Sequence, residues 1–288
     1  MTDTSVAPAR RVDRFRLYVS MDMEGLAGVV SRDALMPGRF EYEAARDWMT
    51  QATLSVCEVA REMGAEELVV SDSHGNGQNI RFERMPEYVK LVRSWPRPLV
   101  MMQGVEDGSY AGAFLIGYHA AATNPAGTLA HTISSELFQE IRLNGRPVSE
   151  AGISAMIAGH FGVPVLLFAG DDVAVAEARR ELGDIPTAIL KRSLGSLSAV
   201  NFAPAAADRI LRDTVREAIG RIGTVKAPQA PASVLVEIRL RTRLIAEWLG
   251  YMPEVARTGA FTVEYQAEDI IAASRFIAFL SLAPTALG

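Results

Sequence analysis

Apolar segments of strand length alternate with helix-length segments from Phe15 to Leu190, and this alternation decides the fold class. Phe15–Met21 alternates apolar and polar residues with the period of a β-strand. A helix is predicted from about Glu41 to Met63, followed by Gly64, a residue suited to the left-handed conformation after a helix. Strands and helices that alternate over this length predict an α/β fold, with a mostly parallel sheet in a three-layer α/β/α core.

Further elements follow from apolar runs and from turn and cap residues. The Asn144-Gly145 pair predicts a tight hairpin turn, and Ser149 is predicted to cap a helix that starts at Glu150. Asp171 or Asp172 is predicted to cap another helix. Strands are predicted at the remaining apolar runs, at residues 68–70, 98–102, 113–118, 129–133, 138–143, 163–169, 187–190 (the last strand of the core) and 234–240.

The pattern changes after Asn201, where a long helix from Pro204 to Ile222 is followed by a Pro- and Ala-rich stretch. We therefore predict three parts. Residues 1–14 form a flexible tail, residues 15–200 a metal-binding catalytic core, and residues 201–288 a smaller C-terminal α+β portion.

Composition excludes several classes of partner. The chain has 288 residues, 22% of them charged, and a formal net charge of −5, so no general attraction for nucleic acid or an anionic membrane is expected. No stretch resembles a secretory signal or a membrane span. The single cysteine, Cys57, rules out a disulfide within the chain and favours a reducing compartment. We expect a cytoplasmic protein with small-molecule or peptide partners.

Polar side chains that can bind metal follow several predicted strands. Asp22 and Glu24 come after the first strand, and His74 and His119 follow two later strands. Because the carboxyl ends of parallel strands meet in one crevice, these side chains are expected to converge. His131 lies in a short predicted strand that could face the same crevice, and Glu150 lies at a helix start.

Each motif also has a simpler interpretation when taken alone. The Asp22-x-Glu24 pair could be a solvated strand end, and His74 could be an exposed side chain in a turn. Gly75 and Gly77 could cradle a phosphate, although no Gly-Lys-Ser/Thr ending follows them. His119 could be a satisfied core residue, whereas a cap or surface role is expected for His160.

Taken together, the carboxylates and imidazoles form a mixed oxygen and nitrogen ligand set. Such a set suits zinc, manganese or cobalt, and zinc is the commonest of these. Two ions that acidify a bound water and polarise an electrophile favour hydrolysis. A serine triad is poorly supported because the chain has no Gly-x-Ser-x-Gly motif, and Cys57, predicted to be buried in a helix, is a poor nucleophile.

The motifs, taken in order, resemble the bacterial D-aminopeptidase family of the dipeptide-permease operon, the DppA type of zinc peptidase. The resemblance runs from about Phe15 to about Phe279. Its motifs are Ser20-Met21-Asp22-Met23-Glu24-Gly25, Asp72-Ser73-His74, Gly117-Tyr118-His119-Ala120, His131 and Asn144-Gly145-Arg146-Pro147-Val148-Ser149-Glu150, with weaker matches at Ala169-Gly170-Asp171-Asp172, Lys191 and Glu247-Trp248.

This resemblance implies a dinuclear zinc aminopeptidase that hydrolyses short peptides from the amino end, typically those that begin with D-alanine. Asp22 would bridge the two ions of each subunit, a metal-bridging hydroxide would attack, and His131 would assist catalysis. The resemblance also implies a homo-oligomeric ring of ten subunits with an internal chamber. The implied zinc ligands are Asp22, Glu24, His74, His119 and Glu150.

Alternatives remain open at this point. The same ligand set would serve another dinuclear metal amidase or a phosphoesterase, and the chain could instead be a non-catalytic peptide-binding accessory of a transporter. Aromatic residues in the C-terminal part would suit a subunit interface but could equally form that part's own core. They are Trp248, Tyr251, Phe261, Tyr265 and Phe276.

Overall fold

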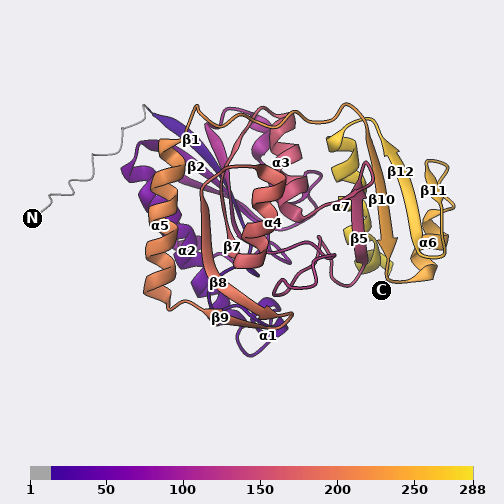
Figure 1. The fold of residues 1–288 in the computed structure, drawn as a ribbon, viewed down its shortest axis with the longest axis horizontal. Coiled ribbons are helices and arrows are strands. Elements are labelled where there is room, and N and C mark those ends of the chain that lie inside the picture. The colour runs from indigo at the N-terminus through magenta and orange to yellow at the C-terminus, as the bar shows by residue number, and fades with distance from the viewer. Residues whose placement is uncertain (1–13, 288) are drawn as a thin grey trace, which may run out of the picture.

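The computed structural model describes residues 14–287, which form two β-sheets with helices packed around them (Figure 1). The predicted tail at residues 1–14 lies outside this range except for its last residue. The first sheet and its helices take up the left and centre of Figure 1, and the second sheet lies at the right.

The first sheet has seven strands in the order β3-β2-β1-β4-β7-β8-β9. All neighbouring pairs are parallel except β8 and β9. The sheet confirms the predicted mostly parallel core. Its strands are β1 (Phe15–Met21), β2 (Ala65–Asp72), β3 (Val89–Val92), β4 (Gly112–Tyr118), β7 (Val165–Asp171), β8 (Thr187–Gly195) and β9 (Ser198–Asn201).

Helices cover both faces of this sheet, as the three-layer prediction requires (Figure 1). On β1, Leu17 and Val19 pack in one apolar cluster with α2 and α5, whereas Tyr18 packs in another with α3 and α4. Because successive side chains of a strand point to opposite faces, one strand contributes to both layers. The helices are α2 (Tyr42–Glu62), α5 (Pro204–Gly220), α3 (Glu150–His160) and α4 (Asp172–Leu182), with a short α1 (Arg32–Leu35).

The second sheet is antiparallel, with five strands in the order β11-β12-β10-β5-β6. Asn144 and Gly145 both have positive φ and form the predicted hairpin turn between β5 and β6. The strands are β5 (Phe138–Leu143), β6 (Arg146–Pro147), β10 (Val234–Leu240), β11 (Val255–Arg257) and β12 (Thr262–Ala267), and the helices of this part are α6 (Arg243–Leu249) and α7 (Ile270–Leu287).

Three predicted strands need correction. The apolar run at 98–102 is buried from Leu99 onward but contains the 3₁₀ helix η2 (Val100–Met102) instead of a strand. The strand beside β2 is β3. Residues 129–133 form no strand, because Leu129 and Ile133 both have positive φ. The run at 187–190 is not the last strand of the core, because β9 adds an antiparallel edge. Two other short 3₁₀ helices are η1 (Phe82–Arg84) and η3 (Val105–Asp107).

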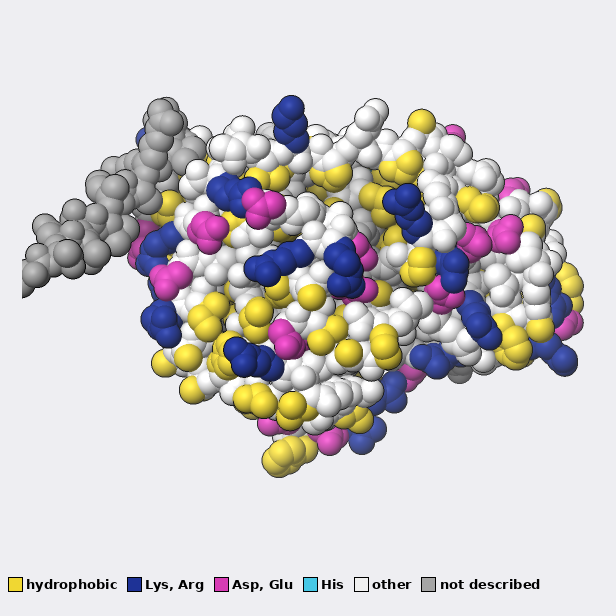
Figure 2. All heavy atoms as spheres, in the orientation of Figure 1, with side chains coloured by type: hydrophobic (Ala, Val, Ile, Leu, Met, Phe, Trp, Pro, Cys, Tyr) yellow, Lys and Arg dark blue, Asp and Glu magenta, His cyan; other side chains and the backbone are white. Residues whose placement is uncertain are grey.

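The two sheets do not divide the chain at a single point. Helix α5, after residue 200, packs against α2 and β8, whereas β5 and β6, before residue 200, belong to the second sheet. The boundary at residue 200 therefore stays a prediction. On the face drawn in Figure 2, positive and negative side chains are interspersed. None of the helices within residues 14–287 is long and apolar enough to cross a membrane.

Candidate metal centre

The predicted ligands meet at the carboxyl ends of the first sheet's central strands. Asp22 directly follows β1, His119 directly follows β4, and His74 lies two residues beyond β2. Glu150 is the first residue of α3, whose start is fixed by the Ser149 cap: its Oγ accepts a hydrogen bond from the Gly152 amide at 3.0 Å. Sheet topology thus brings together residues that are far apart in the sequence.

Two glycines allow the ends of β1 and β4 to approach closely. The Gly25 amide donates to the Gly117 carbonyl at 2.6 Å, and a Cβ at Gly25 would lie 2.0 Å from the Tyr118 carbonyl oxygen. Gly117 has a φ of +76°, and a Cβ there would lie 2.1 Å from the Asp22 carbonyl oxygen. Any side chain at these two positions would push the two strand ends, and with them the ligands Asp22 and His119, apart.

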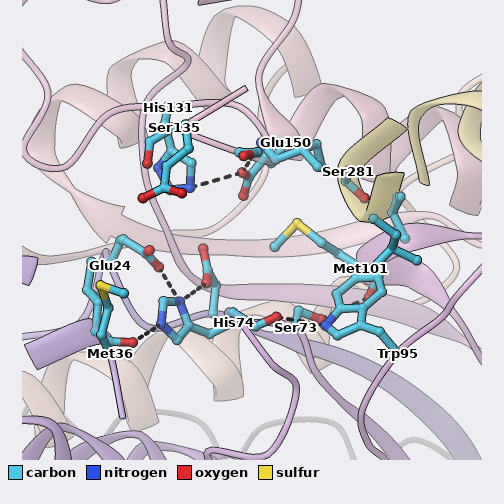
Figure 3. Close-up of a pocket in the computed structure, with 18 of the residues that line it drawn as sticks. Glu24, Met36, Ser73, His74, Trp95, Met101, His131, Ser135, Glu150 and Ser281 are labelled. Atoms are coloured by element: carbon cyan, nitrogen blue, oxygen red, sulfur yellow. Dashed lines mark hydrogen bonds and ion pairs between the residues drawn. The ribbon is translucent and has the colours of Figure 1, made fainter. Parts of the chain in front are cut away.

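Asp22, Glu24 and His74 form the first ligand group. Their candidate ligand atoms all lie within 4.8 Å of one another, and all three residues are buried. His74 Nδ1 lies 2.9 Å from Glu24 Oε2 and 3.4 Å from Asp22 Oδ1 (Figure 3). Two carboxylates and one imidazole suit a zinc ion.

His119, His131 and Glu150 form the second group, again within 4.8 Å of one another. His119 Nε2 lies 3.2 Å from Glu150 Oε2, and His131 Nε2 lies 3.7 Å from Glu150 Oε1. The two imidazole rings stack, with centroids 4.0 Å apart. His131 therefore lies beside the predicted ligands His119 and Glu150, although residues 129–133 form no strand.

Asp22 connects the two groups. Its Oδ1 faces His74, and its Oδ2 lies 3.6 Å from His119 Nε2. Asp22 Oδ2 and His119 Nε2 are both buried, and neither makes a hydrogen bond with any residue that the structure describes. Because buried polar atoms are normally paired, two such orphans facing each other fit a cation between them.

The backbone fixes how each imidazole is presented. A carbonyl oxygen only accepts, so a ring nitrogen facing one must carry its proton. His119 Nδ1 donates to the Ala120 carbonyl, and His131 Nδ1 donates to the Leu129 carbonyl. His74 is held the other way round, by Nε2 on the Leu35 carbonyl at 3.0 Å. In each neutral ring the nitrogen facing the carboxylates therefore has a free lone pair, as a metal ligand requires.

The electrostatics of the metal-free site are those of carboxylates and imidazoles that share protons. Burial lowers the pKa of His119, but Glu150 and Asp22 outweigh burial and raise it to about 10. The pKa of His74 is likewise raised well above its usual value, because Glu24 and Asp22 outweigh burial. Burial alone would raise the pKa of Glu24 and of Glu150. His74 lowers the pKa of Glu24 and His119 lowers that of Glu150, and in both cases the histidine outweighs burial. These carboxylates are therefore held ionised in a buried site, and this suits a divalent cation.

His131 differs from its neighbour His119 in access and charge. Its side chain is 18% exposed, against 1% for His119, and it lines a cavity beside the ligands, where Figure 3 shows it with Glu150 on the side opposite Glu24 and His74. Burial and the nearby His119 lower its pKa. His131 is thus a neutral imidazole that a bound molecule can reach. His160, in contrast, is exposed at the end of α3, as expected.

The cavity has a volume of about 310 Å³ and is lined by both ligand groups. Several residues that line it could not be identified as site residues from the sequence. They come from loops, from the four-residue helix α1 and from η2, where no periodic pattern exists. These residues are Arg32, Leu35, Met36, Trp95, Val100, Met101, Ile133, Ser134, Ser135 and Glu136.

Two residues near the ligands have positioning roles. Asp72, considered above only as part of the His74 motif, does not contact the His74 ring; its carboxylate accepts hydrogen bonds from the Asn79 and Ile80 amides and so orders the loop after His74. Lys191 is fully buried, and its Nζ donates to the carbonyls of Glu24 and Val29, which fixes the loop that carries Glu24.

Comparisons with known proteins each find similarity to a D-aminopeptidase. A family model described as D-aminopeptidase matches residues 15–279. A D-aminopeptidase of Bacillus subtilis (strain 168) is 32% identical over 259 residues, which cover 90% of this chain and 93% of that protein. A solved structure, described as the Zn-dependent D-aminopeptidase DppA from Bacillus subtilis, a self-compartmentalizing protease, is similar with a TM-score of 0.87 at 32% identity. That similarity covers 94% of this chain and 98% of the other.

Proposed function

The chain belongs to the D-aminopeptidase family, and from this membership we propose that it is a dinuclear zinc aminopeptidase that removes the first residue, a D-amino acid such as D-alanine, from short peptides. The relative of known structure is described as zinc-dependent. We propose Asp22 as the bridging ligand. Glu24 and His74 would complete one site, and His119 and Glu150 the other.

One observation carries this proposal. The two oxygens of Asp22 face different groups, with Oδ1 at 3.4 Å from His74 Nδ1 and Oδ2 at 3.6 Å from His119 Nε2. A carboxylate placed in this way can serve two ions at once. Oδ1 also accepts a hydrogen bond from the Met23 amide at 2.8 Å, whereas Oδ2 has no hydrogen-bond partner among the described residues, so an ion on the His119 side would supply the partner that Oδ2 lacks. Zinc ions bound there would polarise the scissile carbonyl and lower the pKa of the attacking water.

The protein's own groups would orient the peptide and move its protons. The carboxylates of Glu24 and Glu150 line the cavity and attract the substrate's free ammonium group. His131 Nδ1 is held by the Leu129 carbonyl, so Nε2 is the atom free to exchange a proton. We propose that Nε2 accepts a proton from the attacking water and returns it to the leaving amine as the tetrahedral intermediate collapses.

The test is a matched pair of substrates. The purified, zinc-loaded protein is expected to release alanine from D-alanyl-glycine faster than from L-alanyl-glycine, and to leave a phosphoester panel intact. Hydrolysis of phosphoesters alone would favour the alternative of a metal phosphoesterase. Absence of all hydrolysis would favour a peptide-binding accessory.

We also propose a homo-oligomer with an enclosed chamber, most simply a ring of ten subunits, located in the cytoplasm. The relative of known structure is described as self-compartmentalizing. In this chain, apolar side chains remain exposed on and around α6, and such residues are favoured at subunit interfaces. They are Leu244, Trp248, Tyr251, Met252 and Phe261, whereas Tyr265 and Phe276 pack against each other. Light scattering that shows an active monomer would contradict the chamber.

A further inference from the structure

One arginine lines the cavity at the ligand groups, and its role needs an explanation. Among the described residues that line it, Arg32 is the one lysine or arginine, against four carboxylates, those of Asp22, Glu24, Glu136 and Glu150. The metal ligands account for three of these carboxylates. Arg32 and Glu136 belong to neither ligand group.

Arg32 lies on α1 and Glu136 in the loop before β5, and the two side chains contact each other where they line the cavity. Arg32 Nη2 lies 3.3 Å from Glu136 Oε1 and 3.5 Å from the hydroxyl oxygen of Ser135. Figure 3 shows Ser135 and Met36 at one end of the cavity, and Trp95 and Ser281 at the other. The ion pair therefore lies at the Met36 end.

Each partner is anchored to a different ligand group. Arg32 lies on α1, whose last residue, Leu35, accepts the hydrogen bond from His74 Nε2 at 3.0 Å. Glu136 follows three residues after Ile133, whose amide donates to Glu150 Oε1 at 2.6 Å. The backbone near each residue is thus positioned relative to the metal ligands.

The contact between Arg32 and Glu136 can be exchanged for another. The two side chains are 60% and 73% exposed, and ion pairs this exposed contribute little to stability. A guanidinium group presents a planar fork of donors that matches any carboxylate. A carboxylate that enters the cavity with the substrate can therefore replace Glu136.

We propose that Arg32 binds the C-terminal carboxylate of the peptide substrate while the first peptide bond lies at the metal centre. The proposal rests on the aminopeptidase function and deepens it, because it names the group that selects short peptides. An extended peptide advances roughly 3.5 Å per residue. Arg32 lies within one helical turn, roughly 5 Å of rise, of Leu35, the residue that contacts His74. This spacing is similar to the length of one or two peptide residues, so Arg32 suits the free carboxylate of a di- or tripeptide.

The experiment compares D-alanyl-glycine with its C-terminal amide, which lacks the negative charge. The wild-type protein is expected to prefer the free acid in kcat/KM. Arg32→Ala should lower kcat/KM for the acid about tenfold, mainly through KM, with a much smaller change for the amide. Arg32→Lys, which keeps the charge but loses the fork, should restore part of the preference.

A second variant separates substrate binding from a merely structural ion pair. Glu136→Gln removes the negative charge of the same pair and so weakens its hold on Arg32, which should lower KM for the free acid. If the pair only held the two loops together, Arg32→Ala and Glu136→Gln would change KM in the same direction, and the proposal would be wrong. Arg142→Ala is the matched control, because Arg142 pairs with Glu140 at 2.9 Å in β5 and does not line the cavity.

The outcomes also distinguish this proposal from the function on which it rests. If the wild-type protein hydrolyses the acid and the amide equally well and Arg32→Ala does not alter that ratio, Arg32 has no role in carboxylate binding, although the aminopeptidase function stands. If the wild-type protein hydrolyses neither peptide, the aminopeptidase function itself fails, and the role of Arg32 fails with it.

Discussion

Asp22 Oδ2 and His119 Nε2 face each other at 3.6 Å in a buried site, and neither makes a hydrogen bond within residues 14–287. A carboxylate and an imidazole that could pair directly are instead held apart by the backbone hydrogen bonds of β1 and β4. The Asp22 amide donates to the Ile116 carbonyl at 2.8 Å, and His119 Nδ1 is held by the Ala120 carbonyl. The arrangement is preorganised for an ion between the two side chains.

Removal of zinc is expected to lower the thermal stability of the protein. A metal that binds only the folded state adds about 4 kcal/mol to the free energy of unfolding when its free concentration is roughly 1,000 times its Kd. The melting temperature, measured by calorimetry, should fall by roughly 10 °C with a chelator and recover on addition of zinc but not of magnesium. An unchanged melting temperature in the chelator would argue against a folded-state metal site.

Zinc binding is expected to release protons and to tighten as pH rises. The pKa of His119 is about 10 in the metal-free site, and that of His74 is also raised, so both rings carry an extra proton at neutral pH. Zinc must displace these protons, and its affinity should therefore increase with pH until the rings titrate.

Titration calorimetry in two buffers with different ionisation enthalpies measures this proton release. The apparent binding enthalpies should differ between the buffers at neutral pH, and the affinity should increase between about pH 6 and pH 9. Equal enthalpies together with a flat pH profile would show that the metal-free histidines are neutral.

His131→Ala is expected to keep the bound metal but to lose turnover, by about 10² to 10⁴ in kcat, because a general acid–base group is removed. The candidate ligand atom of His131 nevertheless lies within 4.8 Å of those of His119 and Glu150, so His131 could also bind the metal. Metal analysis of the variant therefore decides its role, and loss of metal would make His131 a ligand. His160→Ala, at an exposed histidine of α3, is the control and should change neither property.

Lys191→Met is expected to destabilise the fold by about 3 kcal/mol and to weaken zinc binding. The variant leaves the buried carbonyls of Glu24 and Val29 without their donor. It also removes a cation that interacts electrostatically with the buried Asp171, which caps α4. Urea denaturation of the metal-free protein measures the first effect, with Lys226→Met, at an exposed lysine, as the control. Equal stability of the two variants would contradict a role for Lys191 in holding the loop.

The sequence was sufficient to predict the fold and the site residues wherever a local pattern and the tertiary structure agree. Strand β1 has the predicted bounds, and helix α2 ends before Gly64, whose φ is +112°. The placement of Asp22 and His119 follows from the rule that parallel strands end at one edge of the sheet. Periodicity and strand ends are therefore the informative features of this sequence.

The failures occur where tertiary contacts override local preference. Residues 129–133 have the apolar content of a strand, but His131 binds the Leu129 carbonyl and the Ile133 amide binds Glu150. These contacts hold Leu129 and Ile133 at positive φ, a conformation that is costly for a β-branched isoleucine. Arg32 could not be recognised as a site residue from the sequence. Its position depends on the contact between α1 and His74, and no periodic pattern in the sequence predicts that contact.

Metal content per chain shows whether Asp22 bridges two metal ions. Elemental analysis of the zinc-reconstituted protein after dialysis is expected to give about two ions per chain for the wild type. Asp22→Ala, with its fold checked by circular dichroism, is expected to lose both ions. Retention of one ion by this variant would show that Asp22 serves a single site, and a wild-type protein that is folded and active without metal would contradict the account.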